Sequence, residues 1–247
     1  MTFCLDHFRS ALDAALNFLY PPVCQICGQE RAGAADGYVG GKCWSGVRFI
    51  KAPFCERCGL PYPGHITQPF RCENCAEMDF SFRYARSAVA ANGLILEVVH
   101  RYKYNRAVWF EAFLGDLLVR QAAPVLAAEK WDLIVPVPLH PVKEREREFN
   151  QAGRLARHLG RALGLPVHDR LVRRVKFTET QTRLTRSQRA ANMKAAFAPR
   201  AGKELDGAKV ILVDDVLTTG ATTDACARAA RRAGAGEVCV WTVARGI

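Results

Sequence analysis

Two adjacent carboxylates followed by a hydroxyl-rich turn are the residues of this chain best suited to chemistry. Asp214 and Asp215 follow the apolar run 210–213, which is typical of a buried central strand. Ligands of open α/β sheets bind beyond the carboxyl ends of such strands, so the two aspartates are candidate binding groups. The turn after them offers hydroxyl and backbone N–H donors. Its residues are Leu217, Thr218, Thr219, Gly220, Ala221 and Thr222.

The helix that we expect over residues 221–232 directs its positive end at this turn. Successive amides next to a helix N-terminus form an anion site that suits a phosphate group. Carboxylates beside a phosphate site suit a ligand that is a sugar phosphate bound together with a divalent cation. They then accept hydrogen bonds from two hydroxyls while the turn holds the phosphate. The alternative is a strand that ends in a solvated Asp–Asp turn.

The stretch KVILVDDVLTTGATT, residues 209–223, resembles the signature of the type I phosphoribosyltransferases. That signature is a hydrophobic strand, an acidic pair and then T-T-G-x-T. The resemblance implies that Asp214 and Asp215 meet the ribose 2′- and 3′-hydroxyls of phosphoribosyl pyrophosphate, which binds together with Mg²⁺. It implies that residues 217–222 hold the 5′-phosphate of the same ligand.

Two other basic segments are candidates for holding the pyrophosphate. A basic loop follows the apolar segment 133–137 and contains Lys143, Arg145 and Arg147. Arginine suits bidentate phosphate contact, although three interleaved glutamates also fit a solvated charged turn. Lys103 lies in the basic-aromatic stretch HRYKYNR, whose alternative interpretation is an exposed helix end.

A third basic segment covers residues 178–197. Arg183, Arg186 and Arg189 are spaced for one face of a helix,. They are candidates for a mobile lid that closes over the pyrophosphate and excludes water from a reactive ribosyl cation. The same spacing suits contacts to the phosphates of a nucleic acid.

The chain has ten cysteines, and seven of them lie between Cys24 and Cys75. Two C-x2-C pairs are separated by thirteen residues, which predicts a four-thiolate structural zinc site. The alternative is a set of reduced, unligated thiols. The ligands of the predicted site are Cys55, Cys58, Cys72 and Cys75.

A second zinc site is incomplete in the sequence. Cys24 and Cys27 form a third pair, but only Cys43 follows, because Gly40 stands where a second C-x2-C needs a cysteine. These three sulfurs recruit another ligand, pair with other cysteines, or hold no metal. His65 is a candidate fourth ligand, although a lone histidine beside Pro and Gly is more often a surface residue.

The composition limits which partners and which cellular compartment we expect for this chain. The chain has 247 residues and a formal net charge of +11, which fits a polyanionic partner or simply a basic proteome. No apolar run reaches the length of a bilayer span,. Clustered C-x2-C pairs indicate metal binding in a reducing compartment, so we expect a cytoplasmic protein.

The elements that must position these residues alternate between strand and helix after about residue 80. The alternation predicts an α/β fold, a doubly wound and mostly parallel sheet of the type I phosphoribosyltransferase kind. We expect an N-terminal helix at 1–19, a cysteine-rich double zinc-ribbon-like module at 20–80 and a phosphoribosyltransferase-like domain at 81–247. The expected strands are 84–91, 133–137, 210–213 and 238–243, and the expected helices are 94–104, 108–122, 149–163 and 221–232.

Taken together, the motifs resemble the ComF family. They are CERCGLP, PVPLH, FNQ, TQTRL and LVDDVLTTGATT. The resemblance implies a double zinc ribbon on a phosphoribosyltransferase domain. It also implies a role in natural transformation, with incoming single-stranded DNA handled on the cytoplasmic side alongside competence-machinery proteins such as a helicase. Three hypotheses stay open: a pyrophosphate-releasing ribosyltransferase of nucleotide metabolism or salvage, a DNA-handling protein, and a non-catalytic sugar-phosphate sensor or regulator.

Overall fold

The computed structural model describes residues 22–64, 66, 68–76, 78–176, 196–202 and 204–246. Three sequence predictions fall outside these residues. They concern the N-terminal helix at 1–19, His65 as a zinc ligand, and the arginine-bearing lid with Arg183, Arg186 and Arg189.

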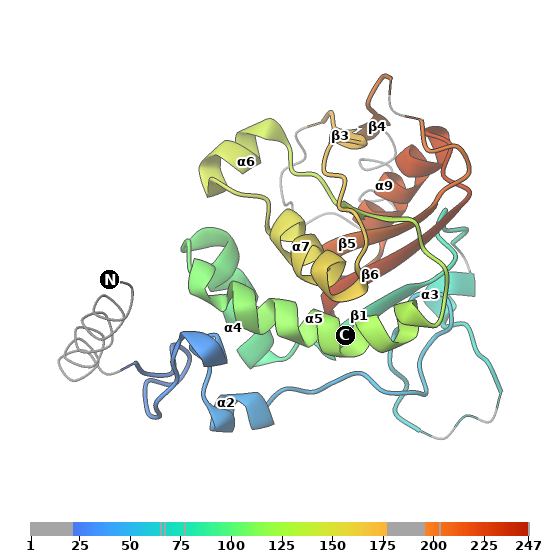
Figure 1. Cartoon of the computed structure of the whole chain (residues 1–247). Coiled ribbons are helices and arrows are strands. Elements are labelled where there is room, and N and C mark those ends of the chain that lie inside the picture. Colours follow the sequence, from blue (N-terminus) through green and yellow to red (C-terminus); the bar gives the residue numbers. More distant parts are fainter. Residues whose placement is uncertain are drawn as a thin grey trace.

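A four-stranded parallel sheet forms the centre of the molecule, in the strand order β1-β6-β5-β2 (Figure 1). The apolar run 210–213 of the central strand β5 is fully buried, as the sequence predicts. Val213 of β5 pairs with the last residue of β2, so Asp214 is the first residue of β5 beyond the end of that neighbour. The strands are β1 (Ala85–Ala90), β2 (Leu133–Pro136), β5 (Lys209–Leu217) and β6 (Glu237–Arg245).

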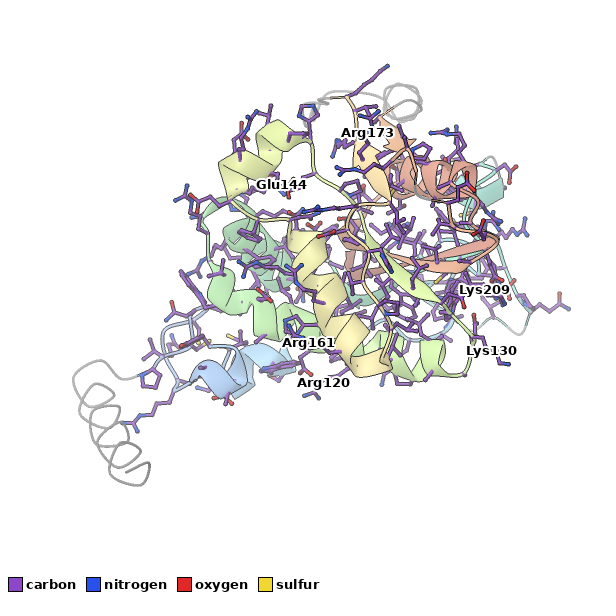
Figure 2. All side chains as sticks on the ribbon, turned by 45° about the horizontal axis from the view of Figure 1, so that its top comes forward. Arg120, Lys130, Glu144, Arg161, Arg173 and Lys209 are labelled. Carbon is purple, nitrogen blue, oxygen red and sulfur yellow. The ribbon has the colours of Figure 1, made fainter. Side chains whose placement is uncertain are left out.

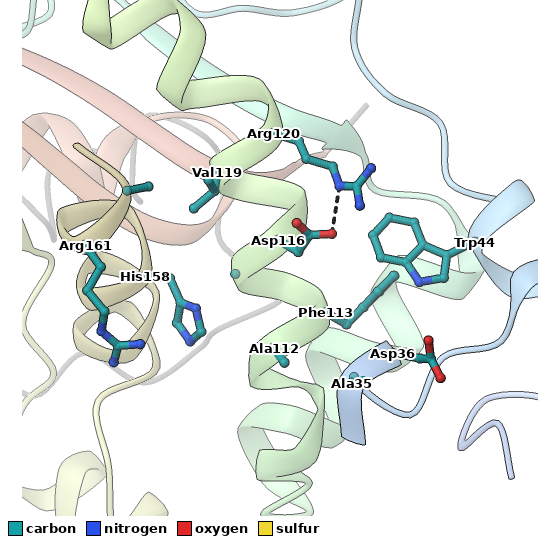
Figure 3. Close-up of a pocket in the computed structure, with 13 residues that line it drawn as sticks. Ala35, Asp36, Trp44, Ala112, Phe113, Asp116, Val119, Arg120, His158 and Arg161 are labelled. Carbon is teal, nitrogen blue, oxygen red and sulfur yellow. Dashed lines mark hydrogen bonds and ion pairs between the residues drawn. The ribbon is translucent and has the colours of Figure 1, made fainter. Parts of the chain in front are cut away.

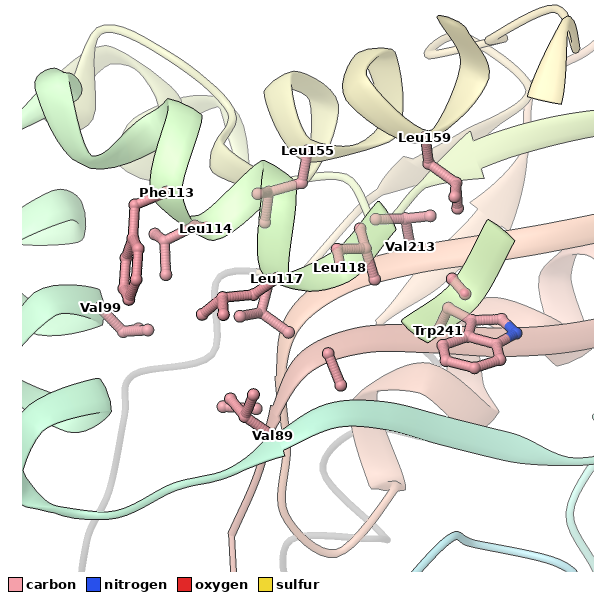
Figure 4. Close-up of a cluster of buried hydrophobic side chains, with 14 of the residues drawn as sticks. Val89, Val99, Phe113, Leu114, Leu117, Leu118, Leu155, Leu159, Val213 and Trp241 are labelled. Atoms are coloured by element: carbon pink, nitrogen blue, oxygen red, sulfur yellow. The ribbon is translucent and has the colours of Figure 1, made fainter. Parts of the chain in front are cut away.

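Helices cover both faces of the sheet, which confirms the predicted α/β class. Helices α5 (Glu111–Ala127) and α7 (Gln151–Leu163) pack on one face. Leucines of both helices meet Val213 and Trp241 of the sheet there (Figure 4). Helix α9 (Ala221–Arg232) packs on the other face through small side chains such as Ala229.

Local signals explain where the helices begin and end. The side chain of Asn150 accepts hydrogen bonds from the N–H groups of Ala152 and Gly153 and so caps α7,. Gly164 ends this helix with a φ of 68°, in the left-handed region that glycine enters without a steric cost. Asn92 caps α4 (Gly93–Tyr104) in the same way as Asn150 caps α7.

The structure corrects three local expectations. The basic segment after β2 is a helix, α6 (Pro141–Arg147), and not a loop, because proline at its first turn and the His140 cap favour a helix start. The helix expected at 108–122 is a 3₁₀ turn, η2 (Val108–Phe110), followed by α5, which continues to Ala127. A short antiparallel pair that the sequence did not predict lies beside α9. Its strands are β3 (Val172–Arg174) and β4 (Phe197–Pro199).

The cysteine-rich part consists of tight turns and very short helices. It joins the sheet through the edge strand β1, since Phe49 forms a β-bridge with Val89 and the Ala85 N–H donates to the Arg57 carbonyl. The short helices are η1 (Ala34–Asp36), α2 (Gly41–Ser45) and α3 (Glu73–Ala76). Among the described residues, no helix has both the length and the apolar character needed to cross a bilayer.

Candidate functional site

The acidic pair, Asp214 and Asp215, lies near the end of β5 with its side chains on opposite faces of the sheet,. Asp215 is buried, and its Oδ1 accepts a hydrogen bond from the Nζ of Lys103 on α4 at 2.6 Å. Asp214 is half-buried, and Arg174 of β3 is among its electrostatic neighbours. The pair therefore connects the α4 side of the sheet with the β3 side.

The two carboxylates differ in how their charge is balanced. Burial raises the pKa of Asp214 to about 7, and the charge of Asp215 beside it acts in the same direction, while Lys103 and Arg174 oppose the rise. The Oδ1 of Asp214 accepts a hydrogen bond from the Asp215 N–H at 2.9 Å. The Oδ2 of Asp215 is buried, and it has no hydrogen-bond partner among the described residues. An unsatisfied buried carboxylate oxygen is costly, so this atom can accept a hydrogen bond from a ligand hydroxyl.

Residues 217–222, which we call the ligand turn, connect the acidic pair to α9. Gly220 has a φ of 84° and is the N-cap of α9, where no side chain caps the helix. The first-turn N–H groups of a helix have no intrahelical partner, and one of them, that of Ala221, lies 3.4 Å from the Thr219 hydroxyl. Thr218 is exposed. The turn therefore offers donors at the positive end of a helix, as an anion requires.

A buried arginine that the sequence analysis missed holds the ligand turn in place. The Nη1 of Arg245 donates to the carbonyl oxygens of Leu217 at 3.0 Å and Thr218 at 2.6 Å. Its Nη2 lies 3.7 Å from the Sγ of Cys58. Cys58, Cys75 and residues 218–220 line one small hollow together with this arginine. One guanidinium thus links the cysteine module to the ligand turn.

The cysteines form two clusters, which we number in chain order. The second cluster consists of the four cysteines between residues 55 and 75, which the structure brings together as predicted. Their sulfurs all lie within 4.8 Å of one another, and the Sγ atoms of Cys58 and Cys72 are 3.6 Å apart. Burial acts to raise the pKa of the Cys55 thiol, but backbone N–H donors from Cys58, Cys72 and Arg57 outweigh it, and the pKa is about 7. Four thiols at tetrahedral spacing, one of them readily ionised, suit zinc. The four are Cys55, Cys58, Cys72 and Cys75.

The first cluster combines three predicted sulfurs with a carboxylate that the sequence analysis did not single out. One ligand atom from each of its four residues lies within 4.8 Å of the others. The Sγ atoms of Cys24 and Cys43 are 3.6 Å apart and both residues are buried. The members are Cys24, Cys27, Glu30 and Cys43.

The predicted pyrophosphate contacts lie on two neighbouring helices. Lys103 of α4 already contacts the acidic pair, as described above. Lys143, Arg145 and Arg147 lie on α6, and Arg147 lies over the Tyr104 ring at 4.9 Å, which joins α6 to the end of α4. Glu144 of α6 and Arg173 of β3, which are labelled in Figure 2, are both exposed.

A larger surface depression lies elsewhere in the molecule (Figure 3). It has a volume of about 710 Å³ and is lined by residues of η1, α2, α5 and α7, including Trp44, Arg120 and His158. Its lining contains neither the acidic pair nor the ligand turn. The size of a depression therefore does not identify the candidate ligand site, which we locate from the chemistry of β5 and the ligand turn.

Comparison with protein families identifies both parts of the chain. Residues 15–78 match the double zinc ribbon domain, and residues 150–246 match the phosphoribosyl transferase domain. Among solved structures, an adenine phosphoribosyltransferase aligns over 57% of this chain and 73% of its own, with 18% identity and a TM-score of 0.37.

Named relatives are similar over most of their length. Competence protein F of Haemophilus influenzae is 31% identical over 221 residues, which cover 82% of this chain and 95% of the relative. The DNA utilization protein YhgH of Salmonella typhi is 32% identical, covering 91% and 97%. Competence protein ComFC of Bacillus subtilis is 29% identical, covering 75% of each chain. By this similarity, the chain belongs to the competence protein F (ComF) family.

Proposed function

We propose that this protein binds phosphoribosyl pyrophosphate at the carboxyl end of β5, in support of DNA uptake. Asp214 and Asp215 accept hydrogen bonds from the ribose hydroxyls, and the ligand turn holds the 5′-phosphate. The observation that supports this most strongly is an acidic pair, with Asp215 buried and Asp214 half-buried, that precedes a helix whose N-cap residue is a glycine. A sugar diol and a phosphate on the same molecule satisfy both halves of that arrangement.

The ammonium group of Lys103 pairs with the carboxylate of Asp215. In the proposed complex the Lys103 ammonium moves to the pyrophosphate, and the ribose hydroxyls take its place at the buried carboxylate. Mg²⁺ accompanies the pyrophosphate, since carboxylate and phosphate oxygens are the ligands it prefers. Lys143, Arg145 and Arg147 of α6 supply further positive charge.

Calorimetry with phosphoribosyl pyrophosphate and Mg²⁺ tests this proposal. The wild-type protein should bind with a saturable signal, and the double variant D214N/D215N should lose it. D169N is the matched control, because Asp169 is an exposed carboxylate. Equal affinity of the wild-type protein and the double variant would show that the ligand binds at another site. No binding by the wild-type protein would contradict the proposal.

The reaction at this site is open to a direct assay. Release of pyrophosphate in the presence of a nucleobase or amine acceptor would make the protein a ribosyltransferase. Saturable binding with no product, across a set of nucleobases, amines and oligonucleotides, would make it a sugar-phosphate sensor. We expect the acceleration of a transfer reaction to come from positioning and electrostatic stabilisation rather than from a covalent nucleophile.

A second function, the handling of single-stranded DNA, rests on an exposed aromatic-basic patch. Tyr104 at the end of α4 is 54% exposed, with the His100 ring 5.0 Å away on one side and the Arg147 guanidinium 4.9 Å from its centroid. Exposed rings beside arginine form platforms on which unpaired bases stack. The net charge of +11 favours a polyanion,. We propose that this occurs in the cytoplasm, alongside helicase-type partners of the competence machinery.

Binding of a fluorescent oligothymidylate tests the patch. Y104A should weaken binding by about tenfold, the effect of losing one stacked base. Y62A is a matched control, because Tyr62 is similarly exposed but lies in the cysteine module. Affinity should fall steeply between about 50 and 200 mM salt. If Y62A has the larger effect, the nucleic acid binds the cysteine module and the patch has no part in it.

A further inference from the structure

The two cysteine clusters are built from the same backbone turn, used twice. In the first, the N–H of Cys24 donates to the Glu30 carbonyl and the Gly28 N–H donates to the Cys24 carbonyl, both at 2.8 Å. In the second, Cys55 donates to Leu60 and Gly59 donates to Cys55, again at 2.8 Å. Gly28 and Gly59 have φ values of 67° and 66°. The pair Cys24 and Cys27 is therefore the structural counterpart of Cys55 and Cys58.

The second halves of the clusters also correspond. Trp44 donates to the Gly40 carbonyl at 2.9 Å at the start of α2, the helix that carries Cys43. Ala76 donates to the Cys72 carbonyl at 3.1 Å around α3, which carries Cys75. Gly40 thus stands at the position that Cys72 fills in the second cluster. The missing fourth thiol of the first cluster would have come from this position.

The side chain of Glu30 occupies the space left by the glycine. A Cβ atom placed on Gly40 would overlap the Cγ and Cδ atoms of Glu30. The carboxylate is anchored by the Lys42 N–H, which lies 3.0 Å from Oε1 and 3.2 Å from Oε2. At the matching place in the second turn stands Leu60, an apolar residue that packs against the core. The first cluster therefore replaces a thiol by a carboxylate rather than lacking a fourth group.

The distances are close to those around one tetrahedral ion. A zinc ion with Zn–S bonds of about 2.3 Å places two sulfurs about 3.8 Å apart, and the Sγ atoms of Cys24 and Cys43 are 3.6 Å apart. Cys27 Sγ and Glu30 Oε1 are 4.0 Å apart. We infer that Glu30 is the fourth ligand of a zinc ion in the first cluster, which makes it a three-thiolate, one-carboxylate site. Carboxylate oxygen is an accepted zinc ligand at about 2.0–2.2 Å.

This ligand set gives the two sites different metal chemistry. Zinc prefers soft thiolates over a hard carboxylate, so the first cluster should release its zinc to a chelator before the second does. Closed four-ligand sites are structural rather than catalytic. The role of Glu30 is thus to hold together the turn between residues 22 and 46.

Zinc competition and cobalt substitution on the full chain test the assignment. The wild-type protein should bind two Zn²⁺ by native mass spectrometry and release them to a chelator in two steps. E30Q keeps an acceptor for the Lys42 N–H but loses the anionic ligand, so the first-released zinc should bind about 100-fold more weakly or worse. E97Q, which changes an exposed glutamate on α4, should match the wild type.

The double variant E30A/G40C provides the converse test. It removes the side chain that would overlap a residue at position 40 and restores a fourth thiol. The first site should then release zinc as slowly as the second, and the thiolate-to-cobalt charge-transfer band should grow from seven ligated thiolates to eight. E30Q should leave that band in place while changing the ligand-field bands of Co²⁺. One zinc in the wild type, or E30Q with unchanged zinc affinity and unchanged cobalt bands, overturns the assignment and leaves Glu30 as a cap for α2.

Discussion

The two cysteine clusters share a backbone turn but differ in what they touch. The second cluster packs into the core on the α9 side of the sheet, and Arg245 connects Cys58 to the ligand turn. The first cluster packs into the core on the α5 and α7 side, near the surface depression lined by Trp44. The two clusters therefore have different surroundings, although their backbone turns match. The second cluster supports the candidate ligand site through Arg245, and the first cluster packs against α5 and α7 on the other side of the sheet.

The largest expected effect comes from removing the zinc ligands of each cluster in turn and comparing the loss of ligand binding. C55S/C58S should remove one zinc and abolish binding of phosphoribosyl pyrophosphate, because metal binding supplies most of the folding energy of such a small module. C24S/C27S should also remove one zinc but leave ligand affinity within about threefold, since ligand-distant sites are close to additive. Native mass spectrometry and calorimetry on both variants provide the check. Equal loss of affinity in both would remove the distinction between the clusters.

The next effect concerns the arginine that carries the connection. R245K loses the fork of donors to Leu217 and Thr218, and we expect it to destabilise the protein by about 2 kcal/mol and to weaken ligand binding. R232K is the control, because Arg232 also donates to a carbonyl, that of Phe197 at 2.9 Å, away from the turn. Urea unfolding and calorimetry would measure both variants. If R232K weakens ligand binding as much as R245K does, the turn is not held by Arg245.

A smaller effect is expected from one glycine of the ligand turn. G220A places a side chain at a φ of 84° and 3.0 Å from the Phe80 ring, which should cost about 1–2 kcal/mol and displace the N–H donors. G202A has a similar φ of 71° but open space around it. It should share the backbone strain without affecting the ligand. Thermal unfolding reports the first quantity and calorimetry the second. Equal ligand affinity in the two variants would show that the turn has no part in binding.

The last prediction concerns the dependence of stability on pH. The pKa of Asp214 rises from its ordinary 3.8 to about 7 in the folded protein, chiefly through burial. Ionisation therefore costs more in the folded state, and stability should fall as the pH rises from about 4 through about 7. D214N should remove this fall, so its gain in stability relative to the wild type should be larger at about pH 8 than at about pH 5.5, where only about half of the fall has occurred. Urea midpoints at both pH values measure it. A D214N effect that is the same at both would contradict the shift.

Much of the fold followed from local patterns. The apolar run before the acidic pair predicted the central strand, and Asn150 with Gly164 predicted the limits of α7 to within two residues. The helix α6 was missed because its alternating charges conceal the proline signal at its start. The strands β3 and β4 have three residues each, too few for a period of two to be recognised.

The candidate site could be predicted only in part, because a sequence pattern shows neighbouring residues but not contacts between residues that are far apart in the chain. The acidic pair and the turn are contiguous in sequence, so their pattern is visible. Arg245 acts on carbonyls 27 and 28 positions away and on Cys58, which is 187 positions away, and the available signal was only a charged residue at the end of an apolar strand. Glu30 was missed because its carboxylate meets Gly40 and Lys42 only after the chain turns back on itself.

In the proposed complex, the acidic pair and the ligand turn bind one molecule from two ends. A crystal structure of the zinc-loaded protein with Mg²⁺ and phosphoribosyl pyrophosphate tests it most directly. We expect ribose hydroxyls within hydrogen-bond distance of Asp214 and Asp215, the 5′-phosphate on the amides of residues 218–221, and Lys103 moved from Asp215 to the pyrophosphate. Density for the ligand at another place, with the Lys103–Asp215 pair intact and the turn empty, would contradict it.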